Sequence, residues 1–303
     1  MAPTPLSETA LALLQGSYDL HIHSAPDIMP RKGNDLEFTR RAAAAGMAGI
    51  VFKSHYVCTA DRATLVNQVV GGTRAYGSLS LNHAVGALNP IAVDIAGRLG
   101  TRLVWFPTVD ARNEIEFQEQ NPGAPKAYWY AIQQELKSKG MSRPPYSILD
   151  DHGKLLPEVY QVLEVIAAYR MILATGHIGI AEIMELVKGA RKVGVTRLIA
   201  THPDFPSCAM PLDVQIELSR QGVLIERSYT TYQTGKFPWE EAYKFIRAVG
   251  PEGNILGTDL GQPNALWPDE GLADFIQRLL DVGFSAGEIR TMVSENPGRL
   301  INP

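Results

Sequence analysis

Short apolar runs, rich in β-branched and aromatic residues, alternate with amphipathic segments along this 303-residue chain. Such runs are typical of buried strands, and the segments between them have the periodicity of helices. Several of these helical segments end in glycine just before the next run, as helices commonly do. We find eight runs, at residues 18–23, 49–55, 75–83, 102–110, 171–177, 197–202, 223–229 and 254–260.

This alternation predicts a single α/β domain over residues 1–303. Strands separated by helices pair in parallel, and eight parallel strands can close into a barrel. We therefore expect a distorted (β/α)8 barrel of the TIM type. The alternative is an open, doubly wound sheet, which normally carries a glycine-rich phosphate loop after its first strand. The HIHSAPD that ends the first run is not such a loop.

The alternation is interrupted after the fourth run, over residues 111–157. This segment is rich in Gln, Asn, Pro and Tyr, and its end, PYSILDDHGKLLPE, predicts a small hairpin that turns at DDHG. Insertions that follow a barrel strand lie on the face that carries function. We therefore interpret residues 111–157 as a lid or substrate-binding loop, and a surface or subunit-contact excursion is the alternative.

Histidines gather at the predicted ends of the strands. One histidine alone is more often an ordinary core or surface residue, but all strand ends of a barrel open onto one face. His21 and His23 are two residues apart in a strand, so both side chains should project from the same face. Six of the seven histidines occupy strand ends, namely His21, His23, His55, His83, His177 and His202, whereas His152 falls in the predicted hairpin.

Asp259 and Lys53 are expected to join these histidines. Asp259 ends the eighth run after residues too apolar for a solvated edge, so its charge needs a partner or a metal. Several imidazoles and a carboxylate around an open position are typical of zinc-type sites. Lys53 lies two residues before His55, so both should face the same side, and burial disfavours the lysine charge. Lys53 either belongs to the metal shell or pairs with Asp259 or an acidic substrate.

The order of these residues resembles the amidohydrolase superfamily of metal-dependent hydrolases: HxH on the first strand, His on the fifth, His on the sixth and Asp on the eighth. The C-terminal SENPGRLI is also similar to the tail that closes many of its barrels. The resemblance implies that His21, His23 and Asp259 bind one divalent metal ion and that His177 and His202 bind a second. It also implies that Asp259 takes a proton from the bridging water as general base. We expect zinc, although these ligands also suit manganese, iron and nickel.

The bridging ligand departs from the superfamily pattern. Binuclear members usually bridge the metals with a carboxylated lysine or a glutamate from strand 4, and the fourth run offers only Asp110, past its end. Our hypothesis is that Lys53, on the second strand, is carboxylated by CO2 and bridges the metals. In the alternative the site is mononuclear, and Lys53 and His55 bind substrate.

The resemblance implies a hydrolase in which metal-activated water attacks an amide, cyclic amide, lactone or ester of a small molecule. His83 is a candidate for polarising the scissile carbonyl, and Arg31 and Arg227 with Tyr229 are candidates for holding a substrate carboxylate. Glu226 alternates with Arg227, so only one of the two can point into the barrel. The alternatives are a metal-dependent decarboxylase or other lyase, a non-catalytic metal-binding barrel, and a phosphoesterase, whose usual D-x-H signature is absent from TDLG.

Composition argues against nucleic-acid and membrane partners. The formal net charge is −4 and no basic block occurs, so nucleic acid is not expected. No stretch is long and apolar enough to span a membrane. The two cysteines, Cys58 and Cys208, are far apart, which fits a reducing cytoplasm. We expect a cytoplasmic enzyme with a small-molecule substrate and, by analogy, a homo-oligomer.

Overall fold

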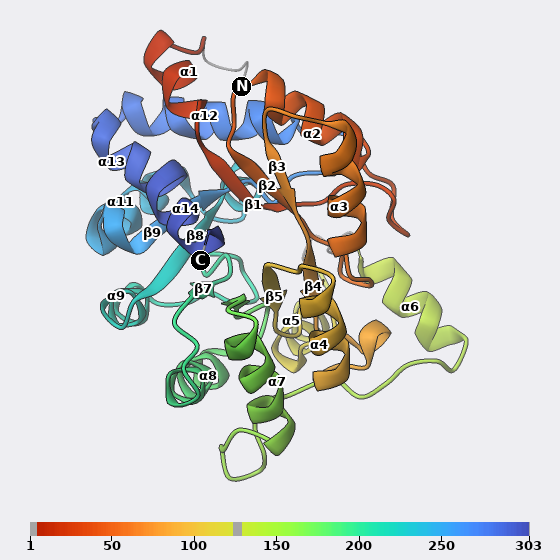
Figure 1. Ribbon diagram of the computed structural model, residues 1–303. Helices are drawn as coiled ribbons and strands as arrows, with labels where there is room; N and C mark the ends of the chain where they lie inside the picture. The colour runs from red at the N-terminus through yellow and green to blue at the C-terminus, as the bar shows by residue number, and fades with distance from the viewer. Residues whose placement is uncertain (1–4, 124–128, 303) are drawn as a thin grey trace.

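The computed structural model describes residues 5–123 and 129–302. Within these residues, parallel strands run through the centre of the molecule and helices cover their outside (Figure 1). Each of the eight predicted runs contains a strand, and the third contains two, so the predicted α/β fold is confirmed. The described strands are β1 (Tyr18–Ile22), β2 (Gly49–Phe52), β3 (Arg74–Tyr76), β4 (Ser78–Ser80), β5 (Leu103–Trp105), β6 (Ile172–Ala174), β7 (Leu198–Ala200), β8 (Val223–Ser228) and β9 (Asn254–Gly257).

The third predicted strand is broken at Gly77, which divides the sheet into strands β1–β3 and strands β4–β9. A Cβ atom on Gly77 would lie 2.2 Å from the Cα of Ala60, so only glycine permits this close approach of helix and strand. The backbone N–H of Ser78 donates to the hydroxyl of Thr59 at 2.8 Å and holds the bend. The barrel is therefore distorted at this point.

The first and last strands meet on the other side. The N–H of Asp259 donates to the carbonyl of His21 at 2.8 Å, and the N–H of His23 donates to the carbonyl of Leu260 at 2.7 Å. We call this contact between β1 and the end of β9 the seam. The strand order from β1 to β9, with the seam joining its ends, is that of a TIM-type (β/α)8 barrel.

Helices connect the strands and form the outer layer. Asn34 and Glu37 form a capping box at the start of the helix that follows β1, as the sequence N-x-x-E predicts. Among the described residues, no helix combines the length and apolar character needed to cross a bilayer. The described helices are α1 (Glu8–Leu14), α2 (Asp35–Ala44), α3 (Ala60–Val69), α4 (Pro90–Arg98), α5 (Arg112–Gln120), α6 (Tyr130–Ser138), α7 (Pro157–Ala168), α8 (Ile180–Lys192), α9 (Leu212–Arg220), α10 (Tyr229–Gln233), α11 (Trp239–Val249), α12 (Pro268–Asp281), α13 (Ala286–Arg290) and α14 (Asn296–Ile301), with short helical turns η1 (His83–Val85), η2 (Pro251–Gly253) and η3 (Thr291–Glu295).

Apolar side chains fill the barrel below the strand ends. Leu300 and Ile301, from the C-terminal SENPGRLI segment, pack against this interior cluster. Trp105 is 1% exposed, and its ring centroid lies 5.3 Å from that of His21, so it forms the floor of the histidine cluster. The cluster also includes Leu20, Val51, Leu103, Ile172, Ala174, Ile199 and Ile255.

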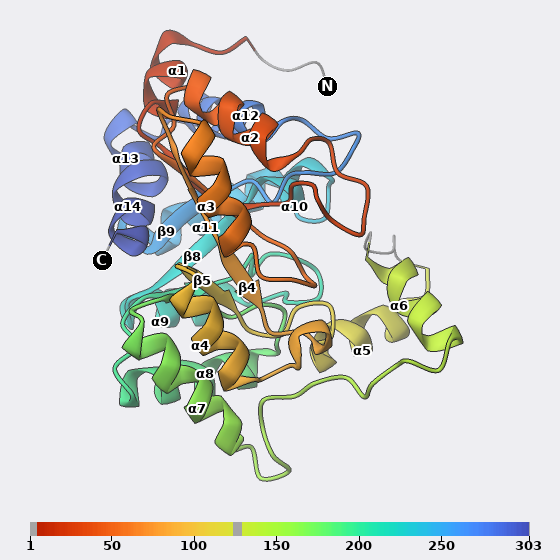
Figure 2. The same cartoon turned by 45° about the vertical axis from the view of Figure 1, so that its right-hand side comes forward.

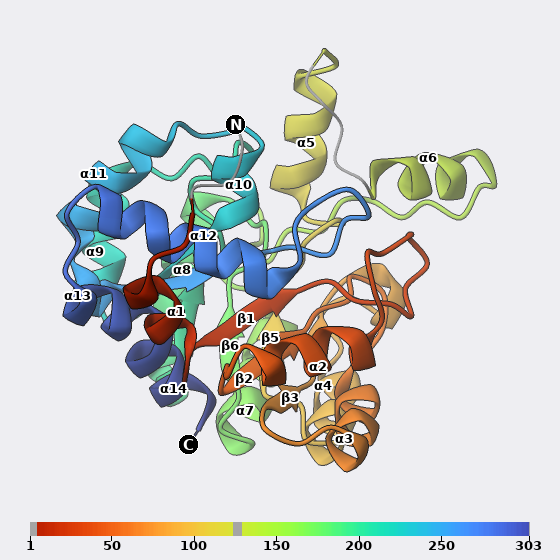
Figure 3. The same cartoon turned by 90° about the horizontal axis from the view of Figure 1, so that it is seen from above.

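Within the insertion at residues 111–157, the helices α5 and α6 project from the barrel (Figures 2 and 3). The predicted hairpin is present, because Leu149 and Leu155 pair antiparallel and the N–H of Asp150 donates to the carbonyl of Lys154 at 2.8 Å. The two helices were not expected, since they bury few side chains and lack the apolar stripe that marks a core helix. Residues 124–128 of this insertion lie outside the described residues.

Candidate metal centre

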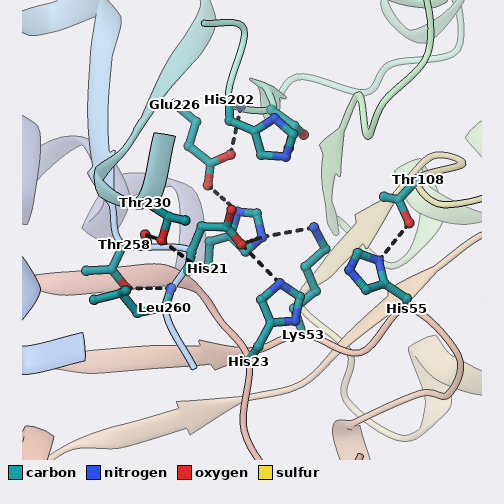
Figure 4. Close-up of polar contacts among 12 residues, drawn as sticks. His21, His23, Lys53, His55, Thr108, His202, Glu226, Thr230, Thr258 and Leu260 are labelled. Carbon is teal, nitrogen blue, oxygen red and sulfur yellow. Dashed lines mark hydrogen bonds and ion pairs between the residues drawn. The ribbon is translucent and has the colours of Figure 1, made fainter. Parts of the chain in front are cut away.

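Five histidines, a lysine and two carboxylates converge at the C-terminal ends of the strands. Figure 4 shows six of these side chains, those of His21, His23, Lys53, His55, His202 and Glu226. The side chains of the whole cluster are buried, and Asp259, with 15% exposure, is the most accessible. His21 lies on β1 and Glu226 on β8, and the others directly follow a strand: His23, Lys53, His55, His177, His202 and Asp259.

His21, His23 and Asp259 form the tightest group. The Nε2 atoms of both histidines lie 3.1 Å from Oδ1 of Asp259. One ligand atom from each of the three residues lies within 4.8 Å of the other two, which is close enough for one metal ion to reach all three. The φ angle of Asp259 is 54°, a left-handed conformation that non-glycine residues rarely adopt and that is common at functional sites.

Glu226 orients two of the histidines. Its Oε1 lies 2.9 Å from Nδ1 of His21, and its Oε2 accepts the backbone N–H of His202 at 3.0 Å. When Nδ1 of His21 donates to this carboxylate, the Nε2 lone pair is available to a metal. The sequence left open whether Glu226 or Arg227 points inward, and the structure selects Glu226.

Arg227 corrects one prediction, since it does not reach the cavity. Its Nη1 donates to Asp204 at 2.8 Å and its Nε to Asn254 at 2.7 Å. The side chains of Arg227 and Asp204 are 0% and 1% exposed. Strand alternation turns Arg227 away when Glu226 faces the barrel interior, so Arg227 supports the fold and does not hold substrate.

His177 and His202 lie next to each other, with ring centroids 4.8 Å apart. Within the described residues, Nε2 of His177 and Nδ1 of His202 are buried and make no hydrogen bond. Buried polar atoms are normally satisfied, so these two nitrogens indicate a missing partner. Glu114 of α5 lies 3.1 Å from Nδ1 of His177, measured from its Oε2. No sequence pattern indicated Glu114, because it lies in the insertion.

Lys53 lies inside the cluster. Its Nζ is 2.9 Å from Nε2 of His21 and 4.8 Å from the ring centroid of Trp105. Burial lowers the pKa of Lys53 to about 8, although Asp259 and Glu226 favour its charge. The ammonium group of Lys53 therefore lies where the ligand atoms of His21 and Asp259 would face a cation.

The charges of the His21 group depend on one another. Burial and Lys53 lower the pKa of His21, but Glu226 and Asp259 outweigh them and raise it to about 9. Burial and the neighbouring Arg31 hold the pKa of His23 well below its usual range. Burial opposes the charge of Asp259, but the two histidines hold the pKa of its carboxyl well below its usual value. Asp259 is therefore ionised at neutral pH.

A cavity of about 630 Å³ opens onto this cluster. His55 lines it, and its Nδ1 lies 2.9 Å from the hydroxyl of Thr108, a partner that the sequence did not indicate. Arg31 also lines the cavity, with Nη2 3.4 Å from Nδ1 of His23. The ring of Tyr229 contributes to the wall, but its hydroxyl donates to Asp274 at 2.7 Å. Of the substrate-binding candidates, the structure thus brings Arg31, His55 and the Tyr229 ring to the cavity.

His83 does not join the cluster, which corrects its predicted place beside the scissile carbonyl. The strand β4 ends at Ser80, and His83 begins the short helical turn η1. Its Nε2 lies 3.0 Å from the carbonyl of Pro144 in the insertion, and its ring lines a different cavity. His55 and His177 also lie three residues beyond their strands and still reach the cluster, whereas η1 directs the ring of His83 towards the insertion.

Solved structures of low sequence identity share this fold. An amidohydrolase from Pseudomonas aeruginosa is 14% identical with a TM-score of 0.61, and the match covers 98% of each chain. The probable dipeptidase PvdM from the same organism is 11% identical with a TM-score of 0.59 over 96% of each chain. A putative 2-pyrone-4,6-dicarboxylic acid hydrolase from Pseudomonas putida is 17% identical with a TM-score of 0.53, over 94% of this chain and 97% of that one. This chain therefore shares the fold of these solved structures, one of which is named as an amidohydrolase.

Comparison with known sequences finds fewer matches than comparison with solved structures. No curated protein matches this sequence. One family model matches residues 16–226, a segment that includes every histidine of the cluster and Lys53 but ends before Asp259. Since this match spans more than half of the chain, the protein belongs to the family DUF6282, described as a family of unknown function.

Proposed function

We propose that this protein is a metal-dependent hydrolase that cleaves a C–N or C–O bond of a small molecule. The observation that carries the proposal is the convergence of His21, His23 and Asp259 beside two further imidazoles with unsatisfied buried nitrogens. The residues fit a divalent ion, because buried imidazoles and a carboxylate are the donors that zinc prefers. The structural neighbours named as a dipeptidase and as a pyrone-dicarboxylic acid hydrolase support this class of reaction.

His21, His23 and Asp259 would hold one ion, and His177 with His202 would hold a second. When bound, such ions polarise a carbonyl oxygen and lower the pKa of water towards neutrality. Asp259 accepts the proton of the attacking water and returns it to the leaving group. Glu226 keeps the Nε2 atom of His21 directed at the site, through the hydrogen bond to Nδ1.

Lys53 is proposed to supply the bridging ligand as a carbamate. The neutral Nζ attacks the carbon of CO2, so that an N–C bond forms while one C=O π bond opens onto oxygen. The proton released from Nζ passes to water, which leaves an anionic carbamate with two oxygen ligands. Burial assists this step, because the lowered pKa of Lys53 raises the share of neutral amine. The alternative is a mononuclear site in which Lys53 and His55 contact substrate. Metal analysis of Lys53→Ala separates the two, since retention of two ions in that variant would refute the bridge.

The test of the proposed function combines metal content with hydrolysis. The zinc-loaded protein is assayed against panels of amides, cyclic amides, lactones and esters, beside Asp259→Asn and His21→Asn. We expect Asp259→Asn to reduce turnover by orders of magnitude and His21→Asn to lose bound zinc. His152→Asn is the matched control, because His152 is exposed in the hairpin and touches none of these residues. A protein that binds no divalent ion, or hydrolyses nothing in these panels, would contradict the proposal.

A further inference from the structure

We propose that the cavity selects a ring-shaped carboxylate, whose acid group is held by Arg31 close to the reacting bond and whose ring lies against an apolar wall. This inference names the substrate class and rests on the proposed function for the reaction itself. Its three supports are the charge of the lining, the placement of Arg31 and the wall contributed by the insertion.

Arg31 and Lys236 are the cations of the cavity lining that lie outside the proposed metal site. The charged side chains that line the cavity among the described residues are Arg31, Lys53, Lys236 and Asp259. Carboxylation would make Lys53 an anion, so Arg31 and Lys236 are the lining cations that remain in either state of Lys53. A divalent ion bound by Asp259 and the histidines would add positive charge. Cations around a cavity concentrate ligands of the opposite sign, which favours an anionic substrate.

Hydrogen bonds to Asp27 hold the guanidinium group of Arg31 in place, with one edge left free for a ligand in the cavity. The Arg31 side chain is 3% exposed, and Asp27, which is 1% exposed, accepts hydrogen bonds from its Nε at 2.9 Å and its Nη2 at 2.7 Å. Both bonds go to one oxygen of Asp27, and within the described part of the chain no hydrogen bond occupies Nη1 of Arg31. The loop is anchored, since the N–H of Lys32 donates to the carbonyl of Gly261 at 2.8 Å. Such a fixed, buried guanidinium suits a carboxylate.

The position of Arg31 also limits the shape of the substrate. Nη2 of Arg31 lies 3.4 Å from Nδ1 of His23, whose Nε2 lies 3.1 Å from Asp259. Only the width of one imidazole ring therefore separates the guanidinium from the proposed general base. A carboxylate held at Arg31 must be attached within a few bonds of the carbonyl that is attacked.

Lys236 provides a second cation at the rim. Its Nζ lies 4.5 Å from the ring centroid of Phe205, and that ring lies 5.1 Å from His202, so the amine lies above the second pair of histidines. Among the residues that the structure describes, no carboxylate forms an ion pair with Lys236. We expect Lys236 to contribute less than Arg31, because it is exposed and its charge is therefore better screened by solvent.

Part of the cavity wall is apolar. Met29 and Trp129 are 4% and 6% exposed and pack in one cluster with Val109, so the insertion contributes to this part of the cavity. Leu260 and Leu266 also line the cavity. Apolar side chains that include an indole offer a surface on which a ring can pack. Charge and shape together indicate a cyclic carboxylate, such as a carboxylated lactone or cyclic amide.

The probes are benzoate, its neutral isostere benzamide, and acetate, which has the charge but no ring. Their dissociation constants are measured by calorimetry on wild-type protein with and without zinc. We expect benzoate to bind at least tenfold more tightly than either benzamide or acetate. Equal affinities for benzoate and benzamide would refute selection for a negative charge. Equal affinities for benzoate and acetate would refute selection for a ring. Failure of all three probes to bind at millimolar concentration would overturn the proposal.

Variants then locate the contact. Arg31→Gln should weaken benzoate binding about tenfold and Lys236→Gln about threefold, whereas the control Arg98→Gln, on the exposed face of α4, should have no effect. Arg31→Lys, which keeps the charge and loses the fork, should lie between wild type and Arg31→Gln. Unchanged benzoate binding in Arg31→Gln, with an unchanged thermal melt, would refute the role of Arg31. Since binding to zinc-free protein requires neither metal nor turnover, loss of the proposed hydrolase function would not produce this result.

Discussion

Glu226→Gln tests whether the charge of Glu226 prepares the metal site. The amide has nearly the same shape, but it removes the charge and replaces one acceptor oxygen with a donor. Glu226 uses both oxygens, one at 2.9 Å from Nδ1 of His21 and one accepting the N–H of His202 at 3.0 Å. A glutamine can serve only one of these partners, and its NH2 group then faces a buried donor.

The size of the effect follows from these two contacts. Loss of the carboxylate behind a metal-binding histidine lowers metal affinity about 10–100-fold, which corresponds to about 1.4–2.7 kcal/mol. A buried donor left without an acceptor costs about 1–3 kcal/mol of folding free energy. We therefore expect Glu226→Gln to bind zinc about 10–100-fold more weakly. We also expect its metal-free form to lose about 1–3 kcal/mol of free energy of unfolding.

Zinc affinity is measured by competition with a chromophoric chelator, and the free energy of unfolding is measured in urea on metal-free protein. Glu241→Gln is the control, because Glu241 is 44% exposed and forms a surface ion pair with Lys244. If Glu226→Gln bound zinc as tightly as the wild-type protein, the argument that Glu226 orients His21 for a metal would be refuted.

Three further outcomes are expected. Zinc affinity should rise with pH up to about 9. His21, with a pKa of about 9, must lose its proton to bind zinc, and Lys53, with a pKa of about 8, loses a charge that repels zinc over the same range. A zinc affinity that is constant above pH 7 in competition titrations would contradict this. Arg227→Met should reduce the free energy of unfolding by about 3–5 kcal/mol, because it leaves Asp204 buried without its cation. If Arg227→Met lost benzoate affinity without losing stability, Arg227 would have to contact the ligand in the cavity. His83→Ala should keep kcat/KM within about twofold, since its ring contacts Pro144 and not the metal centre; a loss of a hundredfold would show that His83 reaches the substrate.

The sequence could predict the fold and the clustering of His21, His23 and Asp259, because both depend on the alternation of side chains along a strand. His21 and His23 share a face of β1, and the strands place them beside Asp259 at 3.1 Å. Lys53 and His55 were likewise expected to face one side, and both line the cavity. These inferences needed only two rules. Alternate residues of a strand point to the same face, and the C-terminal ends of parallel strands lie at the same end of the barrel.

The incorrect predictions concern residues for which the sequence does not determine the face of the strand or the course of the chain beyond the strand end. Glu226 and Arg227 are adjacent, and only the packed strand decides which one faces inward. His83 lies three residues beyond β4, where Gly77 and the turn η1 redirect the chain. Glu114 comes from an insertion helix with no apolar stripe, so no local pattern connects it with His177. Tertiary packing fixes these three features.

Barrel closure and metal binding involve the same residues. Asp19 accepts hydrogen bonds from the hydroxyl of Thr258 at 2.5 Å and from its N–H at 3.1 Å, across the seam. His21 lies on one side of this seam and Asp259 on the other, so an ion bound to both would cross-link the first and last strands. Bound metal stabilises the native state by mass action, and here that stabilisation should be greatest at the seam.

Hydrogen exchange provides the measurement. On addition of zinc, the amide N–H groups of His23 and Asp259, which bond across the seam, should slow in exchange more than that of Phe106, which bonds to Ala174 between the fifth and sixth strands at 2.9 Å. The same comparison in His21→Asn should show no difference between the two regions. If zinc slowed exchange equally throughout the barrel, or left the seam unchanged, the ion could not be bound by ligands from both of its sides.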